Sequence, residues 1–168
     1  MTTPRIRGPQ ERDLPELVRI YNHYVTNTHI TFDIEDFGVE ERRPWFDSFS
    51  KSGPHQLLVA ELDDVAVGYA SSRSFRAKPA YDRSVETTIY LDPAAVGNGL
   101  GSRLYGSLLE ILHAESEVHC AVGGITLPNP VSVALHERFG FTPVGTFREI
   151  GFKFGKYWDV RWYEKDLS

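Results

Sequence analysis

The chain has 168 residues, of which 41% are hydrophobic and 24% are charged, and its net charge is −5. These values exclude a disordered chain, and they argue against a broad nucleic-acid-binding surface, which needs a basic footprint. We therefore expect residues 1–168 to form one domain with one site.

The chain has no apolar run of the roughly 20 residues that span a bilayer, and its first residues lack the apolar stretch of a signal peptide. Its one cysteine, Cys120, cannot form an intramolecular disulfide. Both features favour a cytoplasmic protein that does not contact a membrane. Cys120 is interpreted as a small apolar residue of a strand.

The first half of the chain is predicted to contain two helices and four strands. Asp13 is a candidate N-cap, because apolar residues recur at helical spacing after it. Asp63-Asp64 indicates an antiparallel hairpin. In chain order we expect a short strand at Ile6, a helix over 13–26, an extended connector over 27–37, a helix over 39–50 and strands over 56–62, 66–74 and 84–92.

The second half alternates helices and strands, with Gly140 as a helix C-cap. Early strands followed by strand and helix alternation indicate an α+β or mixed α/β sheet domain. The expected elements are a helix over 99–115, a strand over 118–125, a helix over 130–139, and strands over 141–146 and 157–165 joined by a loop rich in Gly, Phe and Lys.

A glycine-rich loop, Val96-Gly-Asn-Gly-Leu-Gly-Ser102, lies between a predicted strand and an amphipathic helix. Free amides and the positive dipole at a helix start suit a pyrophosphate, and missing side chains let it approach. The spacing is neither that of a P-loop nor that of a dinucleotide fold. The loop therefore favours another phosphate-bearing cofactor, although a tight turn that binds nothing would also explain it.

Glu86 is the candidate general base. Period-two alternation in the strand 84–92 puts Glu86, Thr88 and Tyr90 on one face and Val85, Thr87, Ile89 and Leu91 on the other. A carboxylate just before the glycine loop is suited to take a proton from an amine, directly or through water. The alternatives are a solvated strand residue and an ion-pair partner of Arg76.

Several ordered segments carry a family resemblance. Residues 91–105, including Gly99-Leu100-Gly101-Ser102-Arg103-Leu104-Tyr105, resemble the acetyl-CoA-binding motif of the GNAT N-acetyltransferase superfamily. Ile20-Tyr-Asn-His-Tyr-Val-Thr-Asn27, Arg76-Ala-Lys-Pro-Ala-Tyr-Asp82, Val85-Glu-Thr-Thr-Ile-Tyr90 and Leu135-His-Glu-Arg-Phe-Gly-Phe141 resemble its phosphinothricin and methionine sulfoximine acetyltransferase branch. The resemblance extends from Ile6 to Asp166.

The resemblance implies a fold and an activity. It implies a mostly antiparallel sheet of about seven strands, flanked by helices and splayed between the fourth and fifth strands. It also implies acetyl-CoA as cosubstrate and direct acetyl transfer, in a ternary complex, to the amino group of a small amino-acid analogue. Relatives pair as homodimers, and the aromatic run over residues 152–163 is a candidate interface.

The resemblance also implies cofactor contacts. Backbone amides of Ile89, Tyr90 and Leu91 would hold the thioester carbonyl, and those of Gly97, Asn98, Gly99, Leu100, Gly101 and Ser102 would hold the pyrophosphate. Val96 departs from the family pattern, which has Gln or Arg there, so a side-chain contact is missing. Asn129 aligns with a contact to the pantetheine arm, although turn formation also explains it. His136 replaces a Tyr that protonates the leaving thiolate in many relatives; it is either that acid or only a cofactor contact.

Substrate contacts are implied at Arg76, Ala77 and Lys78, whose basic loop would grip the acidic end of the substrate, and at Thr87, Thr88 and Glu86. Taken alone, that loop would read as solvated. Phe32, Phe75 and Tyr81 would wall the pocket, unless they pack in the core. The histidines show no metal-ligand spacing, so no metal is expected.

Two other functions stay open. Acetylation of protein N-termini or polyamines by the same fold is one, although a polyamine would need an acidic pocket. A non-catalytic acyl-CoA-binding module is the other, and Glu86 argues against it.

Overall fold

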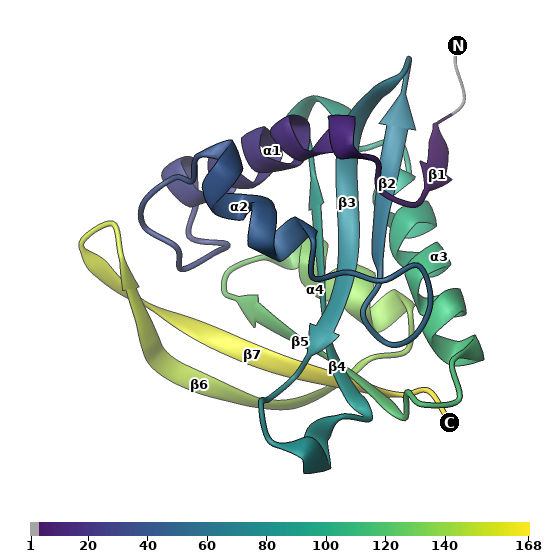
Figure 1. Cartoon of the computed structure of the whole chain (residues 1–168). Coiled ribbons are helices and arrows are strands. Elements are labelled where there is room, and N and C mark those ends of the chain that lie inside the picture. Colours follow the sequence, from purple (N-terminus) through teal and green to yellow (C-terminus); the bar gives the residue numbers. More distant parts are fainter. Residues whose placement is uncertain (1–3) are drawn as a thin grey trace.

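The computed structural model describes residues 4–168, so residues 1–3 of the expected domain lie outside its description. The helices and strands alternate much as predicted (Figure 1). The elements are β1 Arg5–Arg7, α1 Leu14–Asn27, α2 Val39–Phe46, β2 Leu57–Leu62, β3 Val65–Ser74, β4 Ser84–Leu91, α3 Leu100–Ala114, β5 Cys120–Thr126, α4 Pro130–Arg138, β6 Thr142–Lys153 and β7 Lys156–Asp166.

The strands form one seven-stranded sheet in the order β1-β2-β3-β4-β5-β7-β6. All neighbours are antiparallel except β4 and β5, which are parallel. This pair is joined only at Ser84–Glu86 and Cys120–Val122, beyond which the two strands separate. The predicted mixed sheet, splayed between the fourth and fifth strands, is confirmed.

The two faces of the sheet carry different helices. Leu58, Ala60 and Ala70 pack in a core with α3, whereas their neighbours Val59 and Tyr69 pack in a second core with α1. Successive strand residues point to opposite faces, so α1 and α3 cover opposite sides of the sheet (Figure 1). Partly buried residues of α2 complete the α1 core, and those of α4 complete the α3 core.

Two predicted boundaries were wrong. β6 does not end at residue 146 but continues to Lys153, because Phe154 and Gly155 adopt positive φ and close a tight hairpin with β7. α2 ends at Phe46 and not at residue 50. The Ser48 amide bonds the carbonyl of Trp45, three residues earlier, at 3.2 Å, and the Ser48 hydroxyl donates to the same carbonyl at 2.6 Å.

The β6–β7 hairpin forms a long ribbon at one edge of the sheet (Figure 1). Its aromatic run divides between two environments. Tyr163 is buried, and Trp158 stacks on His29 at 4.1 Å between ring centroids. Six other apolar side chains of the ribbon are 57–61% exposed: Val144, Phe147, Ile150, Phe152, Phe154 and Tyr157.

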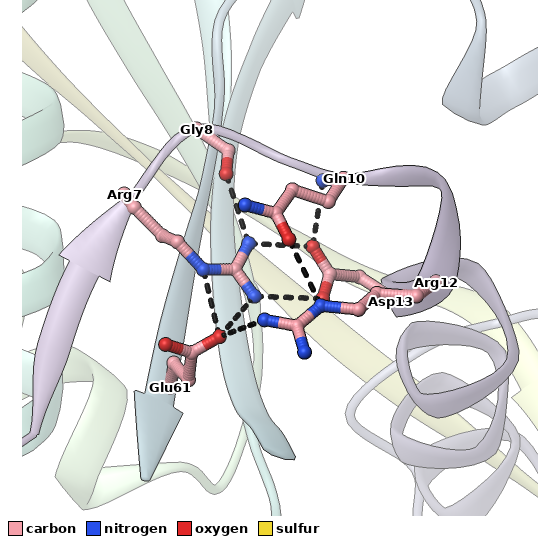
Figure 2. Close-up of polar contacts among 6 residues, drawn as sticks. All are labelled: Arg7, Gly8, Gln10, Arg12, Asp13 and Glu61. Atoms are coloured by element: carbon pink, nitrogen blue, oxygen red, sulfur yellow. Dashed lines mark hydrogen bonds and ion pairs between the residues drawn. The ribbon is translucent and has the colours of Figure 1, made fainter. Parts of the chain in front are cut away.

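A buried charge cluster joins β1, β2 and the start of α1 (Figure 2). Arg7 donates two hydrogen bonds to Asp13, at 2.7 and 2.8 Å, and pairs with Glu61, which Arg12 also contacts. The Asp13 carboxylate accepts the Gln10 amide at 2.7 Å and does not cap α1. The N-cap prediction was therefore right about where the helix begins and wrong about its hydrogen bond.

Within residues 4–168, no helix has the length and apolar character required to cross a membrane.

Candidate active site

Two hollows adjoin β4. The Glu86 cavity, of about 430 Å³, lies on the sheet face that α1 and α2 cover, and the β4–β5 groove, of about 780 Å³, lies where β4 and β5 separate. Thr88 and Tyr90 line both, so the two hollows meet at β4. The Glu86 cavity is lined by Tyr21, Asp33, Arg42, Trp45, Tyr69, Ser71, Arg73, Ser74, Glu86, Thr88 and Tyr90.

Glu86 is the third residue of β4 and lies directly opposite Arg73 of β3. Burial raises the pKa of the Glu86 carboxyl above its ordinary value, and the positive charges of Arg76 and Arg73 partly oppose that rise. A carboxylate with a raised pKa is a stronger proton acceptor once ionised. The geometry therefore gives Glu86 the properties of a general base.

The two faces of β4 differ as the alternation predicted, and this corrects the expectation for Thr87. Its hydroxyl is 2.8 Å from the Tyr105 hydroxyl and 3.2 Å from the Val122 carbonyl, on the α3 side. Both partners of the Thr87 hydroxyl lie on the α3 side of the sheet, so the Thr87 side chain does not face the Glu86 cavity. The Thr88 hydroxyl does, and it bonds the Ser71 hydroxyl at 2.9 Å.

The separation of β4 from β5 leaves backbone groups without a strand partner. The Asp92 amide donates to Val67 of β3, so in this unbulged ladder the amides of Ile89 and Leu91 point the other way, towards β5. Strand pairing with β5 stops at Glu86. The Leu91 carbonyl accepts the Tyr24 hydroxyl at 2.6 Å instead. The Ile89 amide therefore points into the groove as a candidate donor to a carbonyl oxygen.

The glycine loop forms one wall of the groove. Gly97 and Gly99 have φ values of 102° and 72°, and α3 begins directly afterwards, at Leu100. A Cβ at either glycine would meet nothing within 4 Å, so the space in front of the backbone is open. The groove is also lined by Gly101 and Ser102. This cradle fits a pyrophosphate on the first amides of α3.

Three residues of this segment offer a ligand no polar side chain in the groove. The Leu100 side chain is buried in the core, and Asn98 is exposed but does not line the groove. Only their backbone amides remain available to a ligand. Val96 lines the groove with an apolar side chain and offers no donor.

α4 supplies Asn129 and His136 to the groove. The Asn129 side chain accepts the Ser132 amide at 3.1 Å and caps the helix. His136 is 4% exposed, and its Nδ1 lies 2.8 Å from the Ser132 carbonyl. Burial lowers the pKa of His136, although that carbonyl opposes the shift. A neutral ring with its proton on Nδ1 has no proton on Nε2 to give, so the geometry favours a contact over an acid.

The basic substrate loop lies beside the Glu86 cavity but does not line it. Arg76, Ala77, Lys78 and Tyr81 are all exposed. The Arg76 guanidinium lies 4.5 Å from the ring centroid of Phe75. Of these four, Arg76 is the one whose charge acts on Glu86. The lining residues from this part of the chain are Arg73 and Ser74.

Comparison with known proteins adds independent findings. Residues 6–162 match the family model described as an acetyltransferase (GNAT) domain. The chain belongs to the GNAT acetyltransferase family. This acetyltransferase is 54% identical, over 97% of its length and 96% of the relative, to phosphinothricin N-acetyltransferase of Streptomyces coelicolor. It is 30% identical, over 97% and 94%, to L-methionine sulfoximine/L-methionine sulfone acetyltransferase of Salmonella typhimurium.

A solved structure agrees with the fold of this acetyltransferase. The phosphinothricin acetyltransferase of Sinorhizobium meliloti, solved in complex with AcCoA, superposes with a TM-score of 0.93 at 30% identity. The match covers 100% of this chain and 90% of that one.

Sequence reasoning missed most of the residues that line the Glu86 cavity of this acetyltransferase. Phe32, which was expected there, packs against Gly151 of the ribbon, and the next residue, Asp33, lines the cavity and accepts the Tyr21 hydroxyl. Arg42 and Trp45 of α2 also line it. One signal was available: Arg42 lies three residues before Trp45, on the apolar side of its helix, where a charge is unusual.

Proposed function

We propose that this chain is an acetyl-CoA-dependent N-acetyltransferase that acts on the α-amino group of a small amino-acid analogue of the phosphinothricin or methionine sulfoximine and sulfone type. The supporting observation is the junction of the two hollows: the Glu86 cavity meets the β4–β5 groove at Thr88 and Tyr90. An amine beside Glu86 would therefore lie next to an acyl group in the groove. The names of the relatives support the substrate class.

In this proposal different residues of the chain have different roles in acetyl transfer. Acetyl-CoA supplies an acetyl thioester, which the amine attacks to give the amide and free coenzyme A. Glu86 accepts the proton that the ammonium must lose before attack. The Ile89 amide donates to the carbonyl oxygen as negative charge grows on it. The first amides of α3 hold the pyrophosphate, and Asn129 and His136 contact the pantetheine arm.

Glu86→Gln tests the proposed base. We expect kcat to fall by about 100-fold or more, because the amide cannot accept the proton. In the unmodified chain, kcat/KM should rise with pH through an apparent pKa above 4.5, since burial raises the pKa of this carboxyl; the variant should lose that limb. The measurement is coenzyme A release with phosphinothricin, methionine sulfoximine and methionine sulfone.

Calorimetric titration with acetyl-CoA is the control, and its affinity should be unchanged in Glu86→Gln. A variant with the same rate and pH profile would show that Glu86 is not the base. An unmodified chain that binds acetyl-CoA but releases no coenzyme A with any of these amines, with spermidine or with an N-terminal peptide would favour an acyl-CoA-binding module.

The proposal also includes a homodimer in the cytoplasm. The six exposed apolar side chains of the ribbon, which include Phe147 and Phe152, belong to one β-hairpin. A second copy of the chain would cover them. The single cysteine, Cys120, suits a reducing compartment.

A further inference from the structure

Arg42 is a cation of the Glu86 cavity for which the mechanism above has no use. It comes from α2, on the helical side of the cavity. Its guanidinium carbon lies 4.4 Å from the ring centroid of Tyr21, 4.5 Å from that of Trp45 and 4.9 Å from that of Phe37. Three aromatic rings therefore hold the charge in place.

The Arg42 charge has no carboxylate partner within 4.0 Å among residues 4–168. Its Nε is buried and has no hydrogen-bond partner in the same residues. The next residue, Arg43, forms ion pairs with Glu40 and Glu11. A half-buried guanidinium whose hydrogen-bonding capacity is only partly used is costly, and cation–π contacts offset only part of that cost. A ligand oxygen in the cavity would give the Arg42 guanidinium a further acceptor.

The positions of the other charged residues of the cavity indicate which oxygens of a ligand would lie near Arg42. Glu86, Arg73 and Arg76 act on one another at the β3–β4 side of the cavity. The α-ammonium and α-carboxylate of an amino acid share one carbon, so an ammonium at Glu86 puts the carboxylate on the side of Arg73, which lines the cavity. The substrate side chain then extends over Tyr69 towards Tyr21 and Arg42, across aromatic walls that suit its methylene groups.

We propose that Arg42 is the specificity-determining residue that binds the terminal oxygens of the substrate side chain, whether phosphinate, sulfoximine or sulfone. This inference rests on the proposed function. A guanidinium suits it because its planar donors can bind in a bidentate manner the two oxygens of a phosphinate or sulfone, or the oxygen and nitrogen of a sulfoximine. Without Arg42, the aromatic walls would accept an unoxidised thioether as readily.

Three amines with the same chain length test this inference: phosphinothricin, methionine sulfone and methionine, which differ at the terminal phosphorus or sulfur and in whether it carries oxygens. In Arg42→Met we expect KM for the two oxygenated substrates to rise about tenfold or more, the range for loss of a charge-assisted hydrogen bond. The kcat/KM for methionine should change less than about twofold, and Arg42→Lys should be intermediate. Arg43→Met is the matched control on the same helix and should behave as the unmodified chain.

Thermal unfolding and acetyl-CoA affinity of Arg42→Met, both unchanged, would show that the variant folds. Equal losses with all three amines, or an unchanged KM for methionine sulfone, would overturn the role of Arg42 and leave the proposed function intact. Absence of coenzyme A release by the unmodified chain with all three would instead overturn the proposed function and this inference with it.

Discussion

The buried carboxyl of Glu86 affects the stability of the fold. Its pKa is raised by burial, more than Arg76 and Arg73 lower it, so the folded chain holds this proton more tightly than the unfolded chain does. Its contribution to stability is therefore complete below the ordinary carboxyl pKa and is lost as pH rises through the raised value. At neutral pH the ionised side chain destabilises the fold.

We therefore expect Glu86→Gln to raise the melting temperature at pH 7 while activity falls. Near pH 4 and below, where the carboxyl of the unmodified chain is protonated, the difference should disappear. Thermal unfolding at several pH values measures this, with the exposed Glu110→Gln as control. A variant that melts lower than the unmodified chain at pH 7 would show that the carboxylate is stabilised by its arginines.

Among the elements, β1 is the shortest strand, and the Arg7 cluster attaches it to β2 and α1 (Figure 2). Burial raises the pKa of Asp13, but hydrogen bonds from Arg7 and the Gln10 amide bring it below its ordinary value. The hydrogen bond from Arg7 likewise lowers the pKa of Glu61. Both carboxylates therefore add stability above about pH 4.5, and that stability is lost as pH falls through their depressed pKa values.

Arg7→Met should lower the free energy of unfolding at pH 7 by on the order of 3 kcal/mol, because it leaves buried carboxylates unpaired. Its stability should also depend less on pH in the acid range, since those carboxylates are then easier to protonate. Urea unfolding at pH 7 and pH 3.5 measures both effects. Arg12→Met is the control: the Arg12 side chain is 54% exposed and contacts Glu61 and the Gln10 side chain at the edge of the cluster, so its loss should cost less than about 1 kcal/mol. Equal costs for the two variants would contradict this account.

The ribbon and the segment before α2 meet at a second junction of elements. Gly151 of β6 lies so close to Phe32 that a Cβ there would come within 2.1 Å of the ring. Lys153 donates to the Thr31 carbonyl at 2.8 Å beside it. Asp33, which lines the Glu86 cavity, follows directly in the chain.

Gly151→Ala should therefore displace the Asp33 segment. We expect a loss of about 1–3 kcal/mol from overpacking and a higher KM for the amine. Gly145→Ala on the same strand is the matched control, because a Cβ there meets nothing within 4 Å. Thermal unfolding and steady-state kinetics compare the two, and identical behaviour would contradict the proposed junction.

For the whole molecule, the exposed apolar ribbon is the surface that the proposed homodimer would bury. The buried Tyr163 and the stacked Trp158 support the ribbon from within and do not belong to that surface. Of the aromatic run over residues 152–163, the side chains that remain exposed are Phe152, Phe154 and Tyr157, and exposed Phe147 of β6 adds to them.

Sedimentation velocity at micromolar concentration should give a dimer for the unmodified chain. Phe147→Glu combined with Phe152→Glu should give a monomer, because the charges would be buried in the interface. Val65→Glu, at an exposed apolar residue of β3, should stay dimeric. An unmodified chain that sediments as a monomer would remove the dimer from the proposal.

The sequence by itself determined those features that depend on neighbours in the chain. Alternation along residues 84–92 separated Glu86 from Thr87 correctly, and the Asp63-Asp64 turn and the glycine loop before α3 were read from local conformational preference. These predictions succeeded because backbone geometry repeats over two to four residues, so that a few side chains specify it.

Only the tertiary structure decided how the Glu86 cavity is composed. Asp33 and Arg42 line the same cavity as Glu86 but come from segments about 50 residues earlier in the chain, and no local pattern encodes that approach. The same holds for the hydroxyl of Thr87, which turns to Tyr105 of α3, and for Nδ1 of His136, which is held by the Ser132 carbonyl. Packing between distant elements, and the desolvation it brings, determines which groups meet and which keep a proton.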